Sequence, residues 1–130
     1  GARAARTLLE HTDFPAAKID AVAQAISLHV GLTRPPGAPL QPLEAAVLWD
    51  ADKLSKLGVQ ALAYNLGMTF MHGLTLPQRR QNLREFTESV LSRTVASMNT
   101  PAGSVIAQER YQAMLDTLAL WEREEENMPI

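Results

Sequence analysis

The segment Glu44–Gly58 constrains the fold most, because it places charged side chains inside an apolar helical pattern. Four apolar residues recur at helical spacing from the residue before this segment onward: Leu43, Val47, Leu54 and Leu57. Asp50 falls within this stripe, whereas Asp52 is rotated from it by about 200° at 100° per residue. A buried carboxylate is costly unless it is paired, hydrogen-bonded or bound to a metal. The segment therefore predicts a helix packed against partners that satisfy a carboxylate.

Asp50, Asp52 and the neighbouring Lys53 allow two interpretations. One helix face cannot present both carboxylates equally, so one acid can be a solvated surface group while the other caps the end of a neighbouring helix. Alternatively, the two acids and the lysine form part of a site that binds a metal or a ligand. The residues of this segment do not by themselves decide between the two.

The rest of the chain also follows a helical period, interrupted by glycine and proline. Helices are expected over residues 2–11, 15–30, 42–58 with a continuation over 59–71, 77–97 and 104–126. No segment shows the period-two alternation of a strand. We therefore expect one all-α domain over residues 1–130, a compact bundle of about five to six helices.

Two features flank the central segment. His29 continues the apolar stripe of the helix expected over residues 15–30, where it is either a core histidine or a ligand or phosphate contact. Residues 31–42 contain Gly31, Gly37 and four prolines, which predicts a loop. That loop is either the edge of a pocket or a plain connection.

The composition excludes several classes of protein. A net charge of -2 gives no bulk positive charge for nucleic acid, and we expect the cluster Arg79, Arg80 and Arg84 to face water. No apolar run reaches the roughly 18 residues that span a membrane. The cysteine count of 0 excludes disulfides and thiolate sites. We expect a cytoplasmic protein that binds neither membrane nor nucleic acid.

At Asp50–Leu54 the sequence Asp-Ala-Asp-Lys-Leu resembles the HD superfamily of metal-dependent phosphohydrolases. Phe14-Pro15 followed by residues 25–29 resembles its I-x-x-H segment. Residues 44–58 resemble its E-x-x-x-x-x-D-A-D-(R/K)-L-x-x-x-G helix. Residues 98–110 resemble the N-T-x-x-G-x-x-x-A-x-x-R segment of one subgroup. The resemblance covers nearly the whole chain and implies an HD-like helical fold.

The resemblance implies a site built on three catalytic residues, Asp52, Lys53 and His29. In that family a histidine, an adjacent His-Asp pair and a final aspartate hold a divalent metal, and the final aspartate matches Asp52. Lys53 would meet a substrate phosphate, His29 would lie near the phosphate or a second metal, and Asp50 would orient the surroundings of Asp52 without binding the metal itself. Mn, Mg, Ni or Fe suits such ligands, and the metal would supply hydroxide for attack on a nucleotide or other phosphate ester.

The chain departs from the family pattern at the histidines. None of His11, His29 and His72 is followed by Asp, so the His-Asp pair is missing. Because residues 2–11 lack a capping residue before them, we expect the missing ligands upstream of Gly1, and the metal can then be absent from this chain. The alternative is a degenerate, non-catalytic HD-like domain that serves as an interaction or regulatory module. A homodimer through exposed apolar surface is expected in that case.

Overall fold

The computed structural model describes residues 1–128, and every regular element in that range is helical. The elements are α1 (Ala2–Leu9), α2 (Ala16–Leu28), α3 (Leu43–Leu54), α4 (Val59–Leu66), the 3₁₀ turn η1 (Thr69–Met71), α5 (Leu76–Phe86), the π-helical turn η2 (Thr87–Leu91), α6 (Ser92–Ala96) and α7 (Pro101–Glu126). The segments α5, η2 and α6 follow one another without a break. The prediction of an all-α fold is confirmed.

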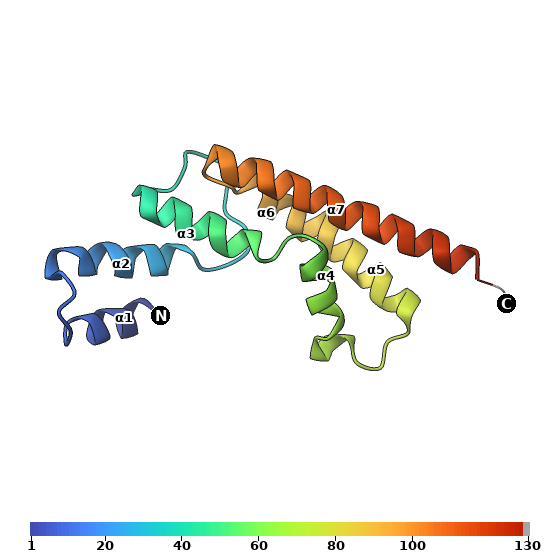
Figure 1. Ribbon diagram of the computed structural model, residues 1–130, viewed down its shortest axis with the longest axis horizontal. Coiled ribbons are helices and arrows are strands. Elements are labelled where there is room, and N and C mark those ends of the chain that lie inside the picture. Colours follow the sequence, from blue (N-terminus) through green and yellow to red (C-terminus); the bar gives the residue numbers. More distant parts are fainter. Residues whose placement is uncertain (129–130) are drawn as a thin grey trace.

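Helix α7 is the element on which most of the others assemble. It packs against α3, α4, α5, η2 and α6, and it lies alongside the rod formed by α5, η2 and α6 (Figure 1). The α1–α2 hairpin extends from the α3 end of the molecule, and α1 packs mainly against α2 (Figure 1). Among residues 1–128, no helix combines the length and the apolar character that a membrane crossing requires.

The largest apolar core lies between α7, α4 and the rod formed by α5, η2 and α6. Its fully buried members include Leu83, Leu91, Met114 and Leu118. At the α3 end, the buried Trp49 donates its indole Nε1–H to Ser97 Oγ at 3.0 Å. This bond satisfies a polar atom that burial would otherwise leave without a partner. Helix α3 is thereby fixed to the end of α6.

The helical path is interrupted between α3 and α4, at a glycine whose backbone conformation other residues rarely adopt. Helix α3 ends at Leu54, and α4 begins after Gly58, whose φ of 100° lies in the left-handed region. Arg110 covers this break, since its Nη1 donates to the carbonyl oxygen of Leu54 at 2.7 Å. The expected continuation over 59–71 is shorter than predicted, because α4 ends at Leu66 before η1.

Helix α7 begins earlier than predicted, at Pro101 instead of residue 104. Thr100 supplies the cap, because its Oγ1 accepts a hydrogen bond from the Gly103 backbone N–H at 3.0 Å. Proline fits the first helical position, where no backbone donor is required. The connection between the two helices expected over residues 77–97 and 104–126 is therefore shorter than predicted, since α6 ends at Ala96 and α7 begins at Pro101.

The predicted buried stripe of α3 is wrong at two positions. Leu43 is 68% exposed and Val47 is 49% exposed. The buried face is instead made by five residues: Ala45, Ala46, Trp49, Asp50 and Lys53. Two adjacent alanines allow the neighbouring helices to approach closely, and the polar side chains on this face find partners there. The positions of Leu43 and Val47 were therefore a poor guide to the inner face of α3, whereas Trp49 lies on it.

The prediction that the arginines of α5 face water is also wrong. The Arg80 side chain is 12% exposed and pairs with Glu122 at 3.2 Å and Glu125 at 2.9 Å. Arg84 pairs with Glu88 and Glu122. The acidic end of α7 lies against these arginines, so the positive cluster on α5 is neutralised within the fold.

Candidate functional site

The buried acid of α3 is Asp50, which is 4% exposed and accepts four hydrogen bonds. Its Oδ1 accepts from the Asn99 backbone N–H at 2.8 Å and from Asn99 Nδ2 at 3.1 Å. Its Oδ2 accepts from the Thr100 backbone N–H at 2.8 Å and from Thr100 Oγ1 at 2.7 Å. The carboxylate thus lies at the positive N-terminal end of α7 and satisfies donors there. Asp50 caps a neighbouring helix, which was one of the two alternatives for this pair of acids.

Gly103 is required by the position of Asp50. A Cβ atom on Gly103 would lie 2.4 Å from Asp50 Oδ2 and 2.8 Å from Thr100 Oγ1. Any side chain at this position would therefore displace the carboxylate or the cap. The Asn-Thr-x-x-Gly spacing of residues 99–103 thus has a direct structural cause in this chain.

Asn99 connects the cap to the loop over residues 30–42. Its Oδ1 accepts from Arg34 Nη1 at 2.8 Å and from the Leu40 backbone N–H at 2.9 Å. Its Nδ2 donates to Asp50. One amide side chain therefore ties the proline-rich loop to both α3 and α7.

Lys53 is the second buried charge of α3, with 0% of its side chain exposed. Its Nζ donates to the carbonyl oxygen of His29 at 2.5 Å and to Asp52 Oδ2 at 2.6 Å, and it lies 4.2 Å from the centre of the Trp49 ring. The carbonyl of His29 belongs to the negative C-terminal end of α2, which a cation stabilises. Lys53 therefore joins the end of α2 to α3.

Asp52 lies on the more open side of α3, with 33% of its side chain exposed. Burial raises the pKa of Asp52, but the hydrogen bond and charge of Lys53, with further electrostatic contributions from Lys56 and His29, outweigh it and lower the pKa overall. The carboxylate is therefore ionised at neutral pH. Lys53 occupies Oδ2, whereas Oδ1 accepts no hydrogen bond from residues 1–128.

His29 ends α2 and is partly buried. Its Nδ1 bonds to the carbonyl oxygen of Ile26. Because a carbonyl only accepts, Nδ1 carries the proton, and Nε2 of the neutral ring is left as an acceptor. His29 is thus neither fully enclosed in the core nor fully exposed. His11 and His72 lie elsewhere, at the ends of α1 and η1.

The structure brings together three of the four predicted site residues and separates the fourth. His29, Asp52 and Lys53 meet where α2 ends against α3. Lys53 Nζ is enclosed by its partners, so contact with a substrate phosphate would require it to leave them, and this role stays a prediction. Asp50 points to the opposite side, toward Asn99 and Thr100.

A divalent metal needs several ligand side chains close together. Among residues 1–128, no group of three or more His, Asp, Glu or Cys side chains is arranged to hold a metal ion. A stable centre generally needs three or more protein ligands. Asp52 can supply one anionic oxygen, but the described residues do not form a complete metal centre.

Comparison with protein families, curated proteins and solved structures found no match to this chain.

Proposed function

We propose that this chain is the C-terminal part of an HD-type metal-dependent phosphohydrolase acting on a nucleotide or another phosphate ester. Asp52 is the residue assigned to the metal, and His29 is assigned to the vicinity of the substrate phosphate. The observation that carries the proposal is the position of Asp52, an ionised and partly exposed carboxylate held by a buried lysine beside His29.

The geometry gives Asp52 one free oxygen in a fixed orientation. Lys53 cannot rotate freely, because it is fully buried and also bonded to the carbonyl oxygen of His29. It holds Oδ2 of Asp52 and leaves Oδ1 for another cation. Such support of a ligand by a neighbouring group is typical of working metal sites. Residues other than those described would have to supply the remaining ligands.

The test is hydrolysis of a phosphate ester, with Mn²⁺ and without it, by a form of the protein that includes the remaining metal ligands, beside the Asp52→Asn variant of the same form. The matched control is Asp13→Asn, since Asp13 is exposed and far from α3 in sequence. The proposal expects metal-dependent turnover that Asp52→Asn abolishes and Asp13→Asn preserves. Turnover that survives Asp52→Asn would overturn the site assignment.

The second candidate is a non-catalytic interaction module, and the surface of the molecule favours it. The accessible area is 8440 Å² for a chain of 14.2 kDa, whereas a folded monomer of this mass exposes roughly 6,800 Å². Leu43, Val47, Val59 and Phe70 contribute to the exposed apolar surface. An excess of roughly 1,600 Å² on one chain is about twice the roughly 800 Å² that each partner buries in a standard protein interface.

Sedimentation distinguishes the two candidates when combined with the hydrolysis assay. A homodimer without metal-dependent turnover would support the interaction module. A monomer that hydrolyses the ester would support the phosphohydrolase. A well-folded monomer at high concentration would contradict the homodimer.

A further inference from the structure

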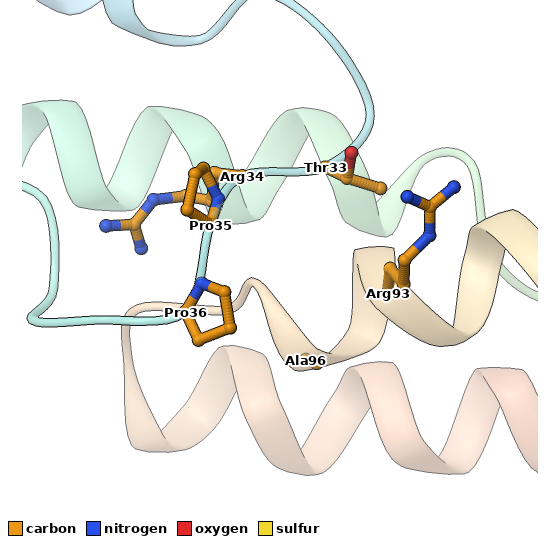
Figure 2. Close-up of a pocket in the computed structure, with 6 residues that line it drawn as sticks. All are labelled: Thr33, Arg34, Pro35, Pro36, Arg93 and Ala96. Atoms are coloured by element: carbon orange, nitrogen blue, oxygen red, sulfur yellow. The ribbon is translucent and has the colours of Figure 1, made fainter.

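A pocket separate from the candidate site lies between the proline-rich loop and α6 (Figure 2). Its volume is about 390 Å³, which falls within the range of sites for small molecules. Six residues line it: Thr33, Arg34, Pro35, Pro36, Arg93 and Ala96. None of them belongs to the cluster of His29, Asp52 and Lys53, so a ligand here would not depend on the proposed function.

The loop wall of this pocket is held in place before any ligand binds. Arg34 donates through Nη1 to Asn99 Oδ1 at 2.8 Å and through Nη2 to the carbonyl oxygen of Ala38 at 2.7 Å. Pro35 and Pro36 have fixed φ angles, which further restricts the loop. Because two of the five N–H groups of Arg34 donate within the fold, its guanidinium is held in place, shapes the wall and adds positive charge near the pocket.

Arg93 is the cation that remains available in the pocket. Its Nε donates to the carbonyl oxygen of Ser89 at 3.0 Å, which fixes the stem of the side chain. Within residues 1–128 its two Nη groups donate no hydrogen bond and it forms no ion pair, whereas Arg80 and Arg84 on the same rod are paired with glutamates. The side chain extends from α6 toward the loop, beside Thr33 (Figure 2).

The lining therefore combines donors and positive charge with an apolar wall. The Thr33 hydroxyl makes no hydrogen bond within the described residues, so it adds a donor to those of Arg93. No acidic residue lines the pocket, and Pro35, Pro36 and Ala96 provide the apolar contact. A guanidinium fork with a nearby hydroxyl suits an oxyanion that has several terminal oxygens.

From this arrangement we propose that the pocket binds a small phosphate monoester that carries a compact apolar group. The phosphate lies against the Arg93 guanidinium and the Thr33 hydroxyl, and the apolar group lies on Pro35, Pro36 and Ala96. Two negative charges favour the phosphate over a carboxylate at a site with two arginines and no acid.

The test is a titration of the whole chain with phenyl phosphate, followed by ¹⁵N–¹H NMR. Saturable shifts are expected at Thr33, Arg93 and Ala96. Arg93→Gln is expected to weaken binding by about tenfold, because it removes the charged fork. Arg123→Gln, which changes an exposed arginine near the end of α7, is the matched control and leaves the affinity unchanged.

A second variant and two further ligands make the test independent of any single substitution. Thr33→Val is expected to weaken binding about threefold, by loss of one hydrogen bond. Inorganic phosphate and benzoate are each expected to bind more weakly than phenyl phosphate, since each lacks one half of the recognised group. Binding unchanged by Arg93→Gln, benzoate binding as tight as that of phenyl phosphate, or no saturable shift at these residues would each overturn the proposal.

Discussion

Asp50 and Asp52 lie two residues apart on α3, yet their surroundings differ in every respect that matters for function. Asp50 is 4% exposed and receives four hydrogen bonds from the start of α7. Asp52 has 33% of its side chain exposed and is bonded by one lysine. Both oxygens of the Asp50 carboxylate accept hydrogen bonds within the fold, whereas Asp52 Oδ1 is left to accept another partner.

The difference follows from the helical period. A step of two residues turns a helix by about 200°, so the two carboxylates face different neighbours. Asp50 faces the backbone donors of α7, and Asp52 faces the end of α2 and the solvent. An acid in an apolar helix therefore does not by itself indicate a catalytic or metal-binding role, because helix capping can account for its burial.

The largest expected effect is that of removing the buried carboxylate. Asp50→Ala leaves two backbone N–H groups and two side-chain donors without an acceptor, so we expect the free energy of unfolding to fall by about 3 kcal/mol or more. Urea denaturation measures this. Asp13→Ala, an exposed acid, is the control and should change stability little. A loss for Asp50→Ala as small as that of the control would show that the cap is unimportant.

A smaller loss is expected for Gly103→Ala, because its Cβ would lie 2.4 Å from Asp50 Oδ2. We expect about 2 kcal/mol from the forced shift of the carboxylate or of α7. The same substitution in the Asp50→Ala background should cost less, since the clash with Asp50 is gone and only the 2.8 Å approach to Thr100 Oγ1 remains. Urea denaturation of both single variants and the double variant gives the coupling energy. Additive losses would contradict the close approach.

Lys53→Met tests the other side of α3. Methionine fills a similar volume without the charge, so the losses are the hydrogen bond to His29 and the ion pair to Asp52. We expect about 1–2 kcal/mol, because Asp52 can reach water when the lysine is gone. NMR titration should show the pKa of Asp52 rising toward its ordinary value. A pKa of Asp52 unchanged in this variant would show that Lys53 does not set it.

The smallest expected effect is the pH dependence that Asp52 adds to stability. Its pKa is lower in the folded chain than the ordinary 3.8. The added stability is therefore fully present above about pH 4 and is lost as pH falls through the folded pKa. Because the side chain is about one-third exposed, we expect less than about 1 kcal/mol. Urea denaturation at acid pH should show a shallower pH dependence for Asp52→Asn than for the unchanged chain.

The sequence pattern predicted the helical class and the principal breaks, because glycine and proline limit helices locally. It also predicted that one acid of the pair could cap a helix. It did not identify the donors, since Asn99 and Thr100 are 49 and 50 residues away from Asp50 in the chain. The signal available was the Asn-Thr-x-x-Gly spacing of residues 99–103, and only the packing of α3 on α7 connects it to Asp50.

The wrong predictions concern which side chains are buried, because tertiary packing decides this and local residue spacing does not encode it. Leu43 and Val47 fit an apolar stripe but are exposed, since the inner face of α3 is selected by Ala45, Ala46 and Trp49. Arg80 was expected to face water, but glutamates more than 40 residues away approach it. The burial of Lys53 depended likewise on the end of α2, which the spacing within α3 could not reveal.

The central claim is that Asp52, and not Asp50, is the acid left free for a cation. The most direct measurement is a Mn²⁺ titration followed by paramagnetic broadening in ¹⁵N–¹H spectra of the chain, Asp52→Asn and Asp13→Asn. We predict that His29, Asp52 and Lys53 broaden at the lowest Mn²⁺ concentrations, that Asp52→Asn removes this broadening, and that Asp13→Asn retains it. Broadening around α3 that persists in Asp52→Asn would contradict the account.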